Sequence, residues 1–247
     1  MTVTLRFCGA ARTVTGSCYL FETPHSKVLI DCGLFQGPKT LKALNRRNAA
    51  RGRAPVLPIY TKADAFAAQG SFKAVEYEQW IEVQPDIRAR YWNAGHLLGS
   101  ASIEIEFLGE GNSGQPLRIL ASGDIGPDAK LLETSPEAPT GFDYVISEST
   151  YGDRERPSIT AQTRRESLAA EVSQAQAADG ALLIPAFAVE RTQELIVDLV
   201  DLMQRGKIPT APIFLDSPLA IRATEVFLQH ASELGPDIDM AAILRSP

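Results

Sequence analysis

Four polar residues with metal-binding or acid–base chemistry stand beside glycine, each at the end of an apolar run or just beyond one. They are Asp31 in LIDCG, His96 in NAGHLLGS, Asp124 in ASGDIG and Glu148 in SESTYGD. Carboxylates and a neutral imidazole are ligands that suit Zn²⁺ or Mn²⁺. Each alone has an ordinary explanation, such as a turn cap, an Asx-turn or a histidine in a polar loop. All four in the order D…H…D…E indicate a metal site.

Short strands must hold these residues in place. Alternating apolar patterns predict strands at 3–8, 17–22, 27–31, 87–92 and 101–108, and shorter buried strands at 117–121 and 144–147. Loops at the ends of rigid strands are where catalytic groups are usually mounted. The neighbouring glycines let the backbone turn sharply and leave room for a substrate.

The pattern changes after Tyr151. Helices are predicted at about 160–178, 189–205 and 218–234, with strands between them at 181–184 and 213–215. This alternation is typical of a small parallel α/β layer. We therefore expect two domains, 1–150 and 151–247. A capping-box variant at Thr61–Asp64 predicts a short helix to about Gln69 inside the first of them.

The composition sets limits on location and partners. The 247 residues carry a net charge of −6, which argues against binding polyanions through bulk charge but leaves a local basic groove open. The basic segment 38–53 is either a solvated helix and loop or a patch for a nucleic-acid backbone.

No signal peptide or membrane-length apolar stretch is present. Cys8, Cys18 and Cys32 form no C-x-x-C pair, which predicts reduced, buried thiols in a cytoplasmic protein.

Successive segments of the chain resemble landmarks of one protein family. The segments are GAARTVTGSCYL, LIDCGLFQGPK, AGHLLGSASIEIE, SGDIG, ESTYGDR, PAFAVERTQEL and LDSPLAIRATEVF. In this order they resemble the β-CASP group of metallo-β-lactamase-fold proteins, which includes RNA-processing nucleases. The resemblance implies an α/β chain: a metallo-β-lactamase fold (an αββα sandwich) over 1–150, and part of a β-CASP insert over 151–247.

The resemblance also implies a role for each of the four residues. His96 and Asp124 would be metal ligands, with Asp124 bridging two Zn²⁺ ions. Asp31 would support the metal cluster from behind, and Glu148 would open the insert and orient the active-site imidazoles. In relatives with the full ligand set, the metals would generate a hydroxide that attacks the phosphorus of RNA. The implied activity is hydrolysis of RNA phosphodiester bonds, in an endonuclease or exonuclease mode.

The chain departs from the family pattern in one important place. The family motif H-x-H-x-D-H is absent, and the sequence passes from KTLKALN directly to RRNAARGRAPVLPIY. We therefore expect an internal deletion near 45–48, and we also expect the second half of the insert to be missing. Only three histidines occur, and His25 and His230 are predicted in a turn and a helix. A single imidazole with two or three carboxylates cannot give two zinc ions about four ligands each, so weak metal binding is expected.

Two other functions stay open at this point. A non-catalytic partner subunit of an active nuclease fits the absent motif but not the retained Asp31, His96, Asp124 and Glu148. A small-molecule hydrolase of the wider fold is disfavoured by ESTYGDR and PAFAVERTQEL, because plain hydrolases lack the insert. Uncovered apolar faces and unpaired strand edges predict either self-association or a nuclease partner. The expected substrate is RNA.

Overall fold

A computed structural model describes most of the chain. It covers residues 2–9, 11, 13–37, 60–109, 111, 114–127, 130–137, 139–155, 159–175, 181–235 and 239–244. The basic segment 38–53 and the expected join near 45–48 lie outside these residues. Unit 1 comprises Met1–Arg90, Ile105–Ile119 and Phe142–Tyr144, and unit 2 comprises Tyr91–Glu104, Leu120–Gly141 and Val145–Pro247. The domain boundary near residue 150 stays a prediction.

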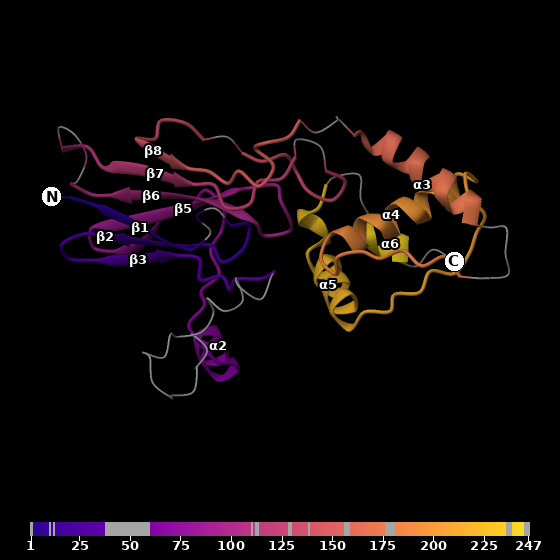
Figure 1. Ribbon diagram of the computed structural model, residues 1–247, viewed down its shortest axis with the longest axis horizontal. Coiled ribbons are helices and arrows are strands. Elements are labelled where there is room, and N and C mark those ends of the chain that lie inside the picture. Colours follow the sequence, from indigo (N-terminus) through magenta and orange to yellow (C-terminus); the bar gives the residue numbers. More distant parts are fainter. Residues whose placement is uncertain are drawn as a thin grey trace. The chain divides into compact units, whose positions relative to one another are not determined.

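Unit 1 begins with a three-stranded antiparallel sheet in the order β1-β2-β3 (Figure 1). Its strands are β1 (Thr4–Gly9), β2 (Cys18–Glu22) and β3 (Lys27–Ile30). The Glu22 carboxylate pairs with Arg6 and Lys27 at 2.8 and 2.7 Å. The prediction of buried thiols is wrong for Cys8 and Cys32, which are exposed near the ends of their strands; Cys18 is half-buried.

A second sheet has five strands in sequence order. They are β4 (Ile81–Gln84), β5 (Ile87–Asn93), β6 (Ala101–Phe107), β7 (Leu117–Ala121) and β8 (Tyr144–Ile146). Between β7 and β8, Asp143 N–H donates to the Arg118 carbonyl, and Ser122 N–H donates to the Ile146 carbonyl. Both partners advance together along the chain, so these two strands run in the same direction. The sequence analysis predicted every strand of the two sheets except β4.

The core of unit 1 joins the two sheets. Phe21 of β2 and Phe107 of β6 are fully buried, and their ring centroids lie 5.6 Å apart. Burying each such side chain contributes about 1.5–3 kcal/mol. At the sheet edge, the hydroxyl groups of Thr23 and Ser26 donate to the Asp86 carboxylate at 3.1 and 2.7 Å. The α/β class and the paired sheets expected from the family resemblance are therefore present.

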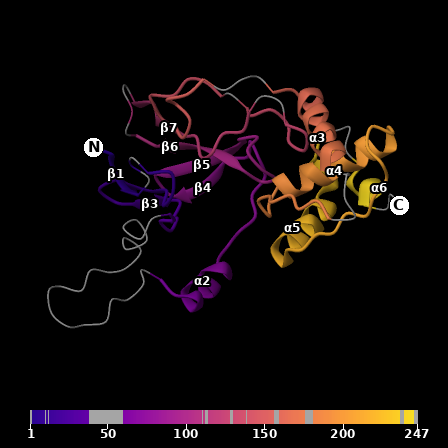
Figure 2. The ribbon, with the colours of Figure 1, turned by 45° about the vertical axis from the view of Figure 1, so that its right-hand side comes forward.

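The helices of unit 2 pack around α4 (Figure 2). They are α3 (Ala161–Ala175), α4 (Arg191–Gln204), α5 (Pro218–Gln229) and α6 (Met240–Leu244), with a 3₁₀ turn at Ala231–Glu233. Their core contains Leu132, Val197, Phe227, Leu234 and Met240. In unit 1, α2 (Lys62–Gln69) begins with the predicted capping box at Thr61. No helix of the described residues is long and apolar enough to cross a bilayer.

The strands predicted at 181–184 and 213–215 are not formed. Neither segment is assigned to a strand or has a ladder partner among the described residues. Their apolar side chains face solvent, with Leu183 at 88% and Phe214 at 86% exposure. A strand-like sequence forms a strand only when a neighbouring strand accepts its backbone hydrogen bonds. The prediction was therefore wrong because it rested on composition without a partner.

Candidate strand-end site

Three of the four predicted residues lie in loops at one edge of the five-stranded sheet, all within unit 2. His96 lies in the loop after β5, Asp124 in the loop after β7, and Glu148 just beyond β8. The first two loops are joined by a 2.8 Å hydrogen bond from Gly126 N–H to the Ala94 carbonyl. The edge therefore carries an imidazole and two carboxylates on neighbouring loops, and their role in a metal site stays a prediction.

Close backbone packing holds the His96 loop. Gly95 has a φ of +60°, and an added Cβ would approach the backbone nitrogen of Pro136 to 2.8 Å. The backbone N–H of His96 donates to the Ser100 hydroxyl at 3.0 Å, and its carbonyl accepts from Lys130 Nζ. The half-buried imidazole is thus mounted on a tightly fixed turn that only glycine allows at position 95.

Glu148 connects two of the loops. Its Oε1 accepts from the backbone N–H of Ile125 at 2.9 Å, and its Oε2 accepts from the backbone N–H of Thr150 at 3.3 Å. Burial raises the pKa of Glu148, but these hydrogen bonds and the nearby His96 outweigh burial, so the pKa lies below its usual range. Glu148 is therefore an anion that fixes the residue next to Asp124.

The two remaining aspartates are exposed. Asp124 is exposed, and its carboxylate has no hydrogen-bond partner among the described residues. Asp31 follows β3 in unit 1, with a φ of +59°, and its Oδ2 accepts from the Ser17 hydroxyl at 2.8 Å. Asp31 is therefore a strand-end residue as predicted, but it belongs to a different unit from the other three.

A buried charged group lies behind the His96 loop, and the sequence analysis missed it. Lys130 Nζ contacts Glu190 Oε1 at 2.6 Å as well as the His96 carbonyl. Glu190 precedes α4 with a φ of +66°, a strained conformation for a glutamate. Glu133 is buried beside them, and its Oε1 has no hydrogen-bond partner. Lys130 and Glu190 are sixty positions apart, so no local pattern reveals the pair.

Burial controls the charge of this group. Burial and the nearby Glu190 raise the pKa of Glu133 to about 7, against the opposing effect of Lys130. Burial also raises the pKa of Glu190, while the hydrogen bond from Lys130 opposes that shift. The protein therefore holds a buried carboxyl group with a pKa of about 7 beside the Lys130–Glu190 pair.

The donor set does not fit a two-zinc centre. Of the three histidines, all of them described, only His96 lies at the sheet edge that carries Asp124 and Glu148. Both Glu148 oxygens already accept backbone hydrogen bonds. His230 instead contacts Glu233 at 2.6 Å. In the part of the chain that the structure describes, no three His, Cys, Asp or Glu side chains are grouped to hold a metal ion. Two zinc ions would need about four ligands each.

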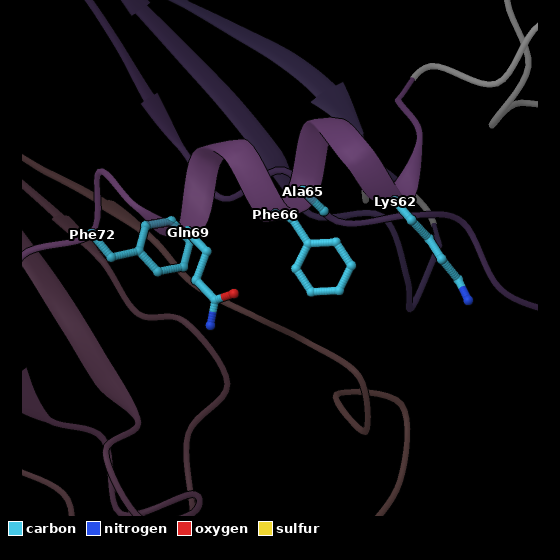
Figure 3. A pocket seen from close by; sticks show the side chains of 5 residues that line it. All are labelled: Lys62, Ala65, Phe66, Gln69 and Phe72. Atoms are coloured by element: carbon cyan, nitrogen blue, oxygen red, sulfur yellow. The ribbon is translucent and has the colours of Figure 1, made fainter.

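A hollow of about 470 Å³ lies along α2, away from these residues in sequence (Figure 3). It is lined by Lys62, Ala65, Phe66, Gln69 and Phe72. The two phenylalanines are mostly exposed, and no side chain of α2 is buried. The hollow contains none of the four predicted site residues, so it is not the site that the sequence predicts.

Comparisons with known proteins identify relatives along nearly the whole chain. Residues 192–245 match the Beta-Casp domain. The chain is 33% identical to Ribonuclease TTHA0252 of Thermus thermophilus over 89% of its own length and 59% of that protein. It is 28% identical to an RNase J-like protein of Methanocaldococcus jannaschii, over 96% of this chain and 63% of the relative.

A eukaryotic relative is similar over a shorter span. Endoribonuclease YSH1 of Kluyveromyces lactis is 28% identical over 73% of this chain and 23% of that protein. The chain thus spans about 60% of the length of the first two relatives. The Beta-Casp match falls on α4 to α6, and the relatives align through both sheets as well. This chain belongs to the β-CASP group of the metallo-β-lactamase fold.

Proposed function

We propose that the strand-end site is that of an RNA phosphodiesterase, and that this chain on its own is catalytically silent. The observation that supports the first part is the gathering of His96, Asp124 and Glu148 at one sheet edge. The names of the relatives, which include ribonuclease and endoribonuclease, support RNA as the substrate. The cytoplasm is the proposed location, as expected from the sequence.

The proposal of catalytic silence rests on the ligand count. One strand-end imidazole is too few for the two-metal chemistry of the family, and the alignment is consistent with a missing segment. The alignment with the Thermus ribonuclease has 269 positions, more than the 247 residues of the whole chain. The relative therefore has residues within this interval that face gaps here.

The retained residues would position the site. Glu148 holds the backbone of Ile125, so it sets the direction in which the adjacent Asp124 faces. The exposed Asp124 carboxylate has no hydrogen bond to lose when it receives a cation or a substrate. His96 is fixed through its backbone by Ser100 and Lys130. These contacts hold the retained residues in fixed positions. Inserting the missing segment would therefore complete the site.

Restoring the missing segment tests this proposal. The H-x-H-x-D-H segment of the Thermus ribonuclease would be inserted between Asn45 and Arg46, and the C-terminal part of that relative would be appended. We expect zinc binding and cleavage of a labelled single-stranded RNA by the restored protein, and no cleavage by the chain as written. Zinc binding without RNA cleavage by the restored protein would contradict the assignment of RNA as substrate.

Three variants of the restored protein separate the roles. Asp124→Asn keeps the shape but removes the charge, and should abolish detectable cleavage. Glu148→Gln should retain metal and slow cleavage about 10- to 100-fold, because it supports the site indirectly. Glu171→Gln, on the exposed face of α3, is the matched control and should leave the rate unchanged. Near-full activity of Asp124→Asn would show that the roles are wrongly assigned.

A partner-subunit role is the second candidate. The observation that favours it is the exposure of Leu183, Phe187 and Phe214, on segments that pair with no strand in the described part of the chain. Such side chains are usually covered by another surface. If this role holds, the chain should raise the RNA cleavage rate or the stability of an active relative when the two are mixed. An unchanged rate and melting temperature in the mixture would argue against it.

A further inference from the structure

The three cysteines of the chain, which the proposed function does not use, gather at one end of the β1-β2-β3 sheet. The β1–β2 register shifts between Phe7 and Gly9, so that Cys8 and Gly9 together face Cys18 across the two strands. Such a bulge places an extra side chain beside its cross-strand neighbour. Cys32 follows β3, and Gly33 N–H donates to the Ser17 carbonyl at 2.9 Å, next to Cys18.

The thiols differ in access and in proximity. Cys8 and Cys32 are exposed, whereas Cys18 is half-buried. Cys8 Sγ donates to the Arg6 carbonyl at 3.9 Å, so Cys8 is held beside the bulge. Burial, followed by the nearby Cys8 and Cys32, raises the pKa of Cys18 to about 11. Cys18 therefore keeps its proton at neutral pH, and within the Cys8–Cys18 pair the exposed Cys8 is the sulfur that a dissolved oxidant meets first.

We propose that Cys8 and Cys18 form a peroxide-sensitive thiol pair, a modification site at the edge of the first sheet. The Cys8 sulfur attacks one oxygen of hydrogen peroxide, which breaks the O–O bond and gives a Cys8 sulfenic acid and one water. The Cys18 sulfur then attacks the Cys8 sulfur. The S–O bond breaks, the S–S bond forms, and the second water leaves with the Cys18 proton.

The products balance: two thiols lose two hydrogens and two electrons, and one peroxide becomes two waters. Facing residues of adjacent antiparallel strands lie within the Cα separation that a disulfide spans, and Cys8 adjoins Gly9, the residue that faces Cys18. The β2–β3 register sets Tyr19 opposite Ile30, which leads to Cys32 opposite Ser17 instead of Cys18, so Cys32 stays a thiol. A dithiol reductant returns the Cys8–Cys18 disulfide to two thiols.

Tryptic mapping of the full chain can identify the bond. Because trypsin cuts after Arg6, Arg12, Lys27 and Lys39, each cysteine lies on its own peptide: 7–12, 13–27 and 28–39. We expect a small molar excess of hydrogen peroxide to remove two of the three titratable thiols. A non-reducing map should then show 7–12 joined to 13–27, and dithiothreitol should separate them.

Single substitutions make the assignment specific. Cys32→Ser should leave the 7–12 to 13–27 link intact. Cys18→Ser should prevent it and leave Cys8 as a sulfenic acid that dimedone labels. A link involving 28–39, oxidation of all three thiols at equal rates, or a disulfide between two chains on a non-reducing gel would each overturn the proposal. Circular dichroism of each variant checks that the sheet is still folded.

Discussion

The buried Glu133 makes the stability of unit 2 depend on pH. Burial and the nearby Glu190 raise the pKa of Glu133 from 4.5 to about 7. Glu133 is buried, with only 8% of the residue exposed. The folded state therefore holds the proton more tightly than the unfolded state. The stabilisation is fully present below about pH 4.5 and is lost as the pH rises through about 7.

The size of the effect follows from the shift. Each pKa unit corresponds to about 1.4 kcal/mol, so ionising Glu133 in the folded protein costs about 3 kcal/mol. Glu133→Gln keeps the size of the side chain but cannot ionise. We expect the variant to be more stable than the parent at pH 8 by about 2–3 kcal/mol and nearly equal to it at pH 4.

Urea unfolding followed by tryptophan fluorescence at several pH values measures this difference. Trp92, in the same unit as Glu133, reports on the relevant part of the chain. Glu171→Gln, on the exposed face of α3, is the matched control and should follow the parent at every pH. Equal pH dependence of Glu133→Gln and the parent would refute the reasoning, as would a loss of stability at pH 8.

Two other substitutions test the packing of unit 2. Asp198 is 1% exposed, and its carboxylate accepts from Arg164 and Arg165 at 2.8 and 2.7 Å. Asp198→Ala should lower the free energy of unfolding in urea by about 3–5 kcal/mol, because two cations lose a buried partner. The exposed control Asp153→Ala, whose side chain is 77% exposed, should cost under about 1 kcal/mol, and equal costs would contradict the argument. Gly95→Ala should speed hydrogen exchange in the loop 94–100, because φ is +60° and no space exists for a Cβ; unchanged exchange would show that the loop is not held as described.

Local patterns predicted most strands and the capped helix. Alternation is a property of a few neighbouring residues, so β1, β2, β3 and β5 to β8 were found within one or two positions of their ends. Helix ends depend on hydrogen bonds and packing as well as on sequence pattern. Helix α5 ends at Gln229 and is shorter than predicted, because a 3₁₀ turn follows it. The segments at 181–184 and 213–215 failed because strand formation depends on a partner elsewhere in the chain.

The site was predictable in part for the same reason. Residues beside glycine at strand ends share a sheet edge whenever their strands run in the same direction, which brought His96, Asp124 and Glu148 together. The Lys130–Glu190 pair and the unpartnered Glu133 oxygen depend on the packing of α4 against the loops, which no local motif encodes. The convergence of the three cysteines likewise depends on a bulge that their spacing does not show.

Zinc stoichiometry tests the central claim most directly. The purified chain would be dialysed against micromolar zinc, then against metal-free buffer, and the retained zinc measured by elemental analysis. With one strand-end imidazole and both Glu148 oxygens engaged, we expect well under two zinc ions per chain and no retained RNA cleavage. Two tightly retained zinc ions per chain, with RNA cleavage that Asp124→Asn abolishes, would contradict the account.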